Sequence, residues 1–424
     1  MNLMLKSLQV FVVRGFGAAA GFLMSLVVTN TTEVNDAGVF FFALALTQAG
    51  GRLLTIGSLN ILLKVIGADF GLSWQRINQT VSVLLRTVFI LSALLFSISL
   101  VFSNQIANLF GLPELPELLP LIALCMFLFA FQQMFSFMLQ GRQQAVWAST
   151  VQNVVTQLSF ITLLLLLVFY GFTQSFNSLF YLYFLCVFFA VCCGAVLWFK
   201  KNGATFDLKA PFSKELKSSL TALFIVTAMG QCVAWAGHFA TARFLSSQDV
   251  AFFASAQRTA TLASFVLIAV NLVVAPKFAK AFGQGNRMEV EKLSLLSSRL
   301  MMLLATPVLL FMIFFPEFLM GLFGEEYKVA APLLQILAIG QFINVITGSV
   351  GYLLNMTDHE KDMRNVVLFS GPLAIVLAFG LTSHFGLIGA AYATATSVAT
   401  QNLLAVWMVK KRLGFNTLNV FRKV

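Results

Sequence analysis

The chain has 424 residues, of which 59% are hydrophobic and only 10% are charged, and its formal net charge is +11. Soluble domains are about half apolar and about a quarter charged, so this composition excludes an ordinary soluble protein and indicates many membrane-spanning segments. The positive charges lie between apolar runs, so they predict membrane topology and not nucleic-acid binding.

Apolar windows of the length that crosses a bilayer, about 20 residues, recur along the whole chain. We place twelve of them, at 9–29, 38–65, 80–103, 117–139, 147–171, 177–199, 218–243, 250–275, 297–315, 331–355, 365–383 and 387–409. No barrel-like alternation is sustained, and no cleavable signal peptide precedes the first window. The predicted fold is an all-α polytopic membrane protein of about 12 transmembrane helices.

The loops between these windows divide by charge. The odd-numbered loops carry only Arg243 and Lys328 as cations, whereas the termini, even-numbered loops and adjoining helix ends carry 22 of the 27 Lys and Arg residues. Because cytoplasmic loops are enriched in Lys and Arg, both termini are expected in the cytoplasm. A miscount by one helix would mix the two kinds of loop, so the split supports twelve windows.

The chain also repeats weakly. Three landmarks of the first half recur in the second half at one constant offset: Asp36 as Asp249, Lys64 as Lys277, and the Leu-Phe-Gly triplet at 109–111 as that at 322–324. We infer two six-helix bundles, residues 1–199 and 218–424, joined by a basic cytoplasmic linker at 200–217. Each half begins in the cytoplasm, so the halves are expected to be parallel repeats around a central cationic cavity.

The three remaining cations, Arg14, Arg52 and Arg258, lie inside windows that contain no Asp or Glu. Arg52 is about 14 residues from the outer end of its window, near the bilayer midplane at about 1.5 Å per residue. A charge there costs at least about 2.5 kcal/mol and usually faces a water-filled cavity or a partner. Arg14 has the alternative of snorkelling to the interface, and Arg258 of snorkelling or pairing with an outer acid.

Polar residues at helical spacing share the windows with these arginines or lie in the corresponding windows of the other half. The candidate substrate contacts are Gln48, Gln133, Gln231, Trp235, His238 and Asn344. Ordinary helix packing is the alternative for each of them, and for His238 above all. A cavity lined by arginine without carboxylates is electropositive, and the guanidinium fork suits phosphate oxygens, so the bound species is expected to be anionic.

Three stretches carry a family resemblance: QVFVVRGFGAAAGFLMSLVVT (9–29), NDAGVFFFALAL (35–46) and LQGRQQ (139–144). They resemble the polysaccharide-transporter branch of the multidrug/oligosaccharidyl-lipid/polysaccharide exporter superfamily, which includes the O-antigen flippases. The resemblance implies a bacterial inner-membrane flippase that moves an oligosaccharide on an undecaprenyl-diphosphate carrier. Arg52 and Arg258 would bind the diphosphate, Arg14 would guide it in, and Trp235 would stack on a sugar.

The remaining expectations concern partners, cofactors and the outer gate. Membrane lipids are expected partners, and a polysaccharide polymerase and chain-length machinery are implied by the resemblance, whereas nucleic acid is not expected. The five cysteines lie in apolar runs without ligand spacing, so no metal site is expected. No cofactor is expected, and coupling to a proton or sodium gradient stays open. An outer gate would pair Asp36 or Asp249 with Arg243 or Arg258, the alternative being solvated loop charges.

Two other functions stay open. A membrane-embedded polysaccharide polymerase or ligase commonly has a long outer loop, but the outer loops near 104–116 and 316–330 are too short for a domain. A small-molecule exporter of the same superfamily that extrudes cations would need buried carboxylates, which the windows lack.

Overall fold

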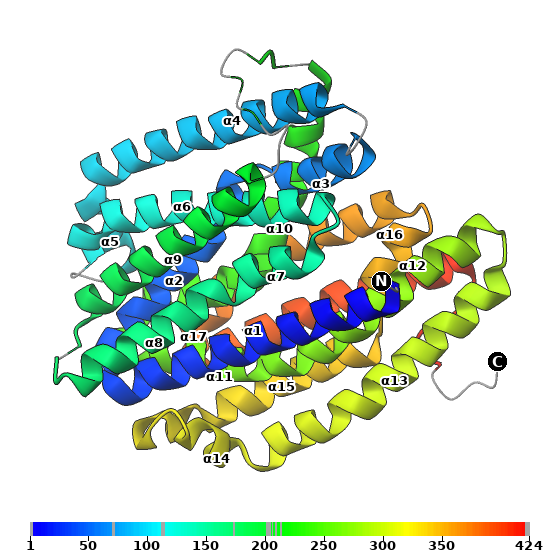
Figure 1. Ribbon diagram of the computed structural model, residues 1–424. Helices are drawn as coiled ribbons and strands as arrows, with labels where there is room; N and C mark the ends of the chain where they lie inside the picture. Colours follow the sequence, from blue (N-terminus) through cyan, green and yellow to red (C-terminus); the bar gives the residue numbers. More distant parts are fainter. Residues whose placement is uncertain are drawn as a thin grey trace. The chain divides into compact units, whose positions relative to one another are not determined.

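The computed structural model describes residues 3–69, 73–111, 115–172, 174–200, 205, 207, 210–212 and 214–419. Within these ranges all regular structure is helical, which confirms the predicted all-α class (Figure 1). Two compact units are present, Met1–Gln231 with Ser246–Ala251, and Cys232–Leu245 with Phe252–Val424. Much of the linker predicted at 200–217 lies outside the described residues, so the domain boundaries stay predictions.

The helices of the first unit precede the linker. They are α1 (Leu3–Thr31), α2 (Val34–Leu54), α3 (Ser58–Asp69), α4 (Trp74–Val101), α5 (Ser103–Phe110), α6 (Leu115–Gly141), α7 (Ala145–Asn153), α8 (Val155–Phe169) and α9 (Phe176–Phe199). Two helices contribute to both units, α10 (Lys214–Phe244) and α11 (Ser247–Thr261).

The remaining helices belong to the second unit. They are η1 (Leu262–Ser264), α12 (Phe265–Gly283), α13 (Arg287–Phe314), α14 (Pro316–Gly321), η2 (Glu325–Ala330), α15 (Ala331–Ile346), α16 (Val350–Met356) and α17 (Glu360–Leu413).

Eleven helical segments of the described chain are long and apolar enough to cross a membrane. The last, α17, has 54 residues, about twice the length that one crossing needs, and its backbone leaves the helical region at Gly386 (φ 59°, ψ −140°). The Asp362 carboxylate accepts hydrogen bonds from Nε and Nη2 of Arg412, 50 residues later, at 2.8 and 2.9 Å. The chain therefore reverses at Gly386, and each of the twelve predicted windows has a helical counterpart.

Four windows that we predicted as continuous helices are interrupted. The breaks lie at residues 55–57 in window 38–65, at Val154 in window 147–171, at η1 in window 250–275, and at residues 347–349 in window 331–355. Positive φ angles mark the first and last breaks, at Ile56 (49°), Gly57 (70°) and Gly348 (76°). Apolar residues continue on both sides of each break, which is why hydropathy alone did not show them.

The helix boundaries carry the same internal repeat as the sequence landmarks. Four pairs of boundaries are separated by the offset that relates Asp36 to Asp249: the ends of α1 and α10 at Thr31 and Phe244, the starts of α2 and α11 at Val34 and Ser247, the starts of α4 and α13 at Trp74 and Arg287, and their ends at Val101 and Phe314. The offset inferred from the sequence landmarks therefore recurs in the secondary structure.

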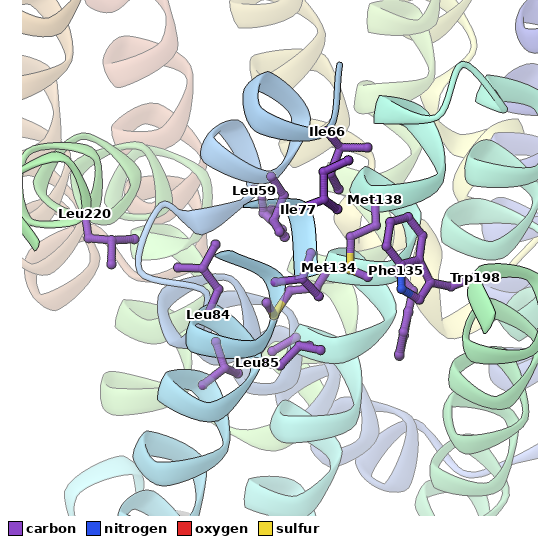
Figure 2. Close-up of a cluster of buried hydrophobic side chains, with 14 residues drawn as sticks. Leu59, Ile66, Ile77, Leu84, Leu85, Met134, Phe135, Met138, Trp198 and Leu220 are labelled. Carbon is purple, nitrogen blue, oxygen red and sulfur yellow. The ribbon is translucent and has the colours of Figure 1, made fainter. Parts of the chain in front are cut away.

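The core of the first unit forms where α3, α4, α6 and α9 meet (Figure 2). Figure 2 shows Met134, Phe135 and Met138 of α6 beside Trp198 of α9, with Ile77 of α4 nearby. Trp198 is 1% exposed and Met134 is fully buried. Truncating such side chains to Ala leaves a cavity and costs about 2–5 kcal/mol, so this cluster holds the four helices together tightly.

The second unit packs through small residues. An alanine cluster joins α10 and α17: Ala236, Ala240, Ala374, Ala378 and Ala393. A Cβ at Gly237 would come within 2.8 Å of the Phe253 ring, so only glycine fits at that contact. Small residues let helix backbones approach closely, which is how helices gain packing energy in a membrane.

The described part of the linker follows α4. Three polar residues at four-residue spacing form one face of that helix: Asn78, Ser82 and Arg86. Asn78 Nδ2 donates to Thr205 Oγ1 at 2.8 Å, the Asp207 amide donates to Ser82 Oγ at 2.8 Å, and Arg86 Nη2 donates to the Ala210 carbonyl at 3.0 Å. These contacts attach the linker to the first unit before α10 begins.

Candidate substrate-binding site

The break between α2 and α3 lies one turn after Arg52. The chain turns there through Ile56 and Gly57, both at positive φ, and the Thr55 hydroxyl donates to the Arg52 carbonyl at 2.7 Å. A Cβ at Gly57 would come within 2.8 Å of the backbone of Leu223 in α10. The helix break is thus a turn at Gly57 that packs closely against α10. Discontinuous helices of this kind often form binding sites in transporters.

Arg52 occupies the last turn of α2, where the carbonyl end of the helix favours a cation. Its side chain is half-buried, and it forms no hydrogen bond or ion pair with any described residue. Gln48, one turn earlier, is also half-buried. A half-buried guanidinium without a protein partner has unused donors that an anionic ligand can take.

Arg14 has a protein partner. Its Nε donates to Ser149 Oγ of α7 at 3.3 Å, and its side chain is half-buried. Close packing fixes this contact, since a Cβ at Gly17 would come within 2.7 Å of Asn153. The structure therefore holds Arg14 toward α7, and its role in guiding the substrate stays a prediction.

Arg258 lies in the second half at a place that resembles that of Arg52. It is half-buried and sits in the last turn of α11, directly before the η1 interruption. Neighbouring Gln257 donates to the Ala234 carbonyl at 3.3 Å. Both candidate diphosphate ligands therefore precede a helix break, Arg52 in window 38–65 and Arg258 in window 250–275.

His238 is buried between aromatic rings. Its ring centroid is 5.1 Å from Trp235 and 5.1 Å from Phe253, and only 5% of the residue is exposed. Nδ1 is buried without a hydrogen-bond partner. Trp235 is half-buried, so its indole retains accessible surface. The contact of His238 with the substrate stays a prediction, as does the alternative that it serves helix packing.

The remaining polar candidates divide by exposure. Gln133 is 2% exposed and accepts from Gln152 Nε2 at 2.7 Å, so it serves the contact between α6 and α7 in this conformation. Asn344 is half-buried and donates to Gln341 Oε1 at 3.0 Å, and Gln231 is half-buried. Their contacts to sugar stay predictions, with Gln133 the least accessible of the three.

The gating candidates lie at or next to the starts of α2 and α11. Asp36 is in the first turn of α2, and Asp249 is in the first turn of α11. The Asp249 carboxylate accepts from the Ser246 amide at 3.1 Å and from the Ser246 hydroxyl at 2.7 Å, which caps α11. Arg243 is exposed, with its guanidinium 5.7 Å from the Phe244 ring centroid. The pairing of an acid with a cation in a gate stays a prediction.

The sequence interpretation missed the role of Arg142, which lies within the LQGRQQ stretch. The guanidinium donates to the Trp198 carbonyl at 2.6 Å and lies over two indoles, 4.3 Å from the Trp198 centroid and 5.0 Å from that of Trp74. Burial of the guanidinium lowers the pKa of Arg142. Two tryptophans far apart in the sequence form this cage, so no local pattern signalled it.

Two family models and one curated relative match this chain. The model of the polysaccharide biosynthesis protein family matches residues 5–282, and that of the MatE family matches residues 222–380. The probable low-salt glycan biosynthesis flippase Agl15 of Haloferax volcanii is 24% identical over 423 residues, which cover 95% of this chain and 83% of that protein.

Two solved structures show the same fold. The lipid II flippase MurJ in an inward closed conformation has a TM-score of 0.78 at 14% identity, covering 99% of this chain and 91% of that one. An inward-facing multidrug resistance MATE family transporter of the MOP superfamily has a TM-score of 0.73 at 15% identity, covering 95% and 98%. Since its family model spans well over half of the sequence, the chain belongs to the polysaccharide biosynthesis protein family.

Proposed function

We propose that this protein is a flippase that moves an anionic, polyprenyl-diphosphate-linked oligosaccharide across a cell membrane by alternating access. The named relatives are flippases and transporters, which supports a transport function over that of a polymerase or ligase. A glycan flippase that aligns over 95% of this chain supports a glycan cargo.

The observation that carries the substrate class is the state of Arg52. A permanent charge lies half-buried at a helix break in an apolar span, without a described protein partner. A charge in an apolar span costs free energy. The guanidinium of Arg52 would donate two parallel hydrogen bonds to phosphate oxygens, which would offset that cost. Arg258 at the second break would supply another positive charge, and the accessible polar groups of Gln48, Gln231, Asn344 and Trp235 would contact the sugar.

The proposal includes a location. We place the protein in a bacterial inner membrane with both termini in the cytoplasm, on the strength of the charge asymmetry between loops. The undecaprenyl tail would stay in the lipid while the head group crosses. An O-antigen repeat unit is the specific cargo that we propose, taken onward by a polymerase.

The test uses purified protein in liposomes with a fluorescent polyprenyl-diphosphate-linked disaccharide, whose exposure is read by quenching with an impermeant reductant. Arg52→Gln should lower the flipping rate at least about tenfold, because one charge-assisted pair is lost. Arg52→Lys should recover only part of the rate, because the ammonium has no bidentate fork.

Arg364→Gln is the matched control, since it removes one positive charge at an exposed position near the start of α17. It should flip at the native rate. A native rate in Arg52→Gln, with equal protein incorporation, would show that Arg52 does not bind the diphosphate.

A small-molecule exporter is the second candidate, favoured by the MatE match over residues 222–380 and by the MATE fold. The same liposomes decide between the two functions. An exporter would move a fluorescent organic cation down an imposed ion gradient and would leave the diphosphate-linked probe in place. The flippase should show the opposite pattern, because the candidate site carries arginines and no carboxylate.

A further inference from the structure

The first residues of α11 pack with the first half of the chain. Ser246–Ala251 belong to the first compact unit, whereas α11 enters the second unit from Phe252 onward. The contact is made with the start of α2, at Gly38. A Cβ on Gly38 would overlap the carbonyl oxygen of Ser247 and would lie 2.6 Å from its carbonyl carbon.

This contact is backbone against backbone. The atoms that block a Cβ at Gly38 are the carbonyl oxygen, carbonyl carbon and Cα of Ser247, so no side-chain rotation relieves the overlap. Glycine is the only residue that lets the two helix starts approach so closely. Three neighbouring residues are buried, Ala37 and Ala251 fully and Val250 at 1% exposure.

The two helix starts are also equivalent under the repeat. Val34 and Ser247, the first residues of α2 and α11, are related by the same offset as Asp36 and Asp249. In the proposed topology both helices begin on the outer side. Asp249, one of the two acids expected to close this side, accepts hydrogen bonds from its own capping residue Ser246. A close backbone contact between Gly38 and Ser247 is therefore present at the helix starts where the gate was expected.

We propose that Gly38 and the backbone of Ser247 form the outer seal of the transport path, which must part each time the path opens outward. This inference rests on the proposed alternating access and adds the residues that close it. The seal works through close steric fit, so its strength depends on the size of residue 38 and not on the side chain of residue 247.

The experiment measures labelling of Gln48→Cys by an impermeant maleimide added to intact cells, with the native cysteines alone as background. Gly38→Ala and Gly38→Val should raise the labelling rate, the Val variant by at least about fivefold, since overpacking shifts the population away from the sealed state. Ser247→Ala should label at the native rate, because its backbone carbonyl is unchanged.

Gly380→Val is the matched control. Gly380 is also helical, but nothing lies within 4 Å of a Cβ built there, so this variant should label at the native rate. Native rates in both Gly38 variants, or an equal rise in Gly380→Val, would overturn the seal. Folding is checked by protein level and by a monodisperse detergent-purified peak, and Gly38→Ala covers the case in which the Val variant does not fold.

Labelling does not depend on the cargo, so the two proposals fail separately. Unchanged labelling with intact Arg52-dependent flipping would remove the seal and leave the flippase. Raised labelling without diphosphate-probe flipping would retain the seal in a transporter of another cargo.

Discussion

Two arginines show how differently this protein treats a charge at the end of an apolar helix. Arg142, just after α6, is 3% exposed and enclosed by two indoles and a carbonyl. Arg52, at the end of α2, is half-buried, and its guanidinium forms no described hydrogen bond or ion pair. A cation enclosed by protein groups, like Arg142, stabilises a fold, whereas a half-buried cation like Arg52 is available to a ligand.

Arg142 should therefore affect stability. Arg142→Gln removes two cation–π contacts and a charge-assisted hydrogen bond, at a cost of about 2–4 kcal/mol. Arg142→Lys keeps the positive charge but should retain only part of the stability, because an ammonium does not stack flat on an indole as a guanidinium does. Thermal unfolding of the purified protein measures both, with exposed Arg364→Gln as the control. Equal melting temperatures for all four proteins would refute the structural role.

At the scale of elements, the helix breaks need replacement partners for freed backbone groups. Between α7 and α8, no described backbone hydrogen bond joins the Val155 amide to the Val151 carbonyl. The Gln132 side chain fills the gap, donating from Nε2 to the Val151 carbonyl at 2.7 Å and to Thr156 Oγ1 at 3.0 Å. One buried amide of α6 thus bridges both arms of the interrupted helix, as a low-dielectric interior requires.

Gln132→Leu should weaken this bridge. The buried Val151 carbonyl would lose its partner at a cost of about 1–3 kcal/mol, and the break should open more often. Hydrogen exchange of the α7–α8 peptide should quicken relative to that of α9. Gln140→Leu is the control on the same helix, because the Gln140 side chain forms no described hydrogen bond. If exchange in the two variants is the same, Gln132 does not hold the break.

For the whole molecule, twelve spans and an internal repeat with one constant offset set the proposed topology. The Asp362–Arg412 pair brings together the two ends of α17, as two spans joined at Gly386 require. The chain folds back there, so the residues around Gly386 should face the side opposite to Arg412. The charge asymmetry of the loops then predicts that this side is the outer one.

Impermeant thiol labelling in intact cells tests this topology. Single cysteines at exposed Ser175 and Phe385 should label from outside, whereas one at exposed Gln284 should label only after permeabilisation. Labelling at position 284 in sealed cells would contradict the predicted orientation of the chain in the membrane. So would the absence of labelling at position 385 in cells with a normal protein level.

The sequence by itself determined the class, the twelve spans and the offset of the repeat, because bilayer length, apolar composition and loop charge are properties of short segments. It also singled out Arg52, since a lone charge in an apolar window is visible without coordinates. The breaks at Gly57 and Val154 were not visible, because the apolar pattern runs through them. The Arg142 cage and the Gly38 contact needed the tertiary structure, since each joins residues far apart in the chain, and only packing decides which buried groups meet.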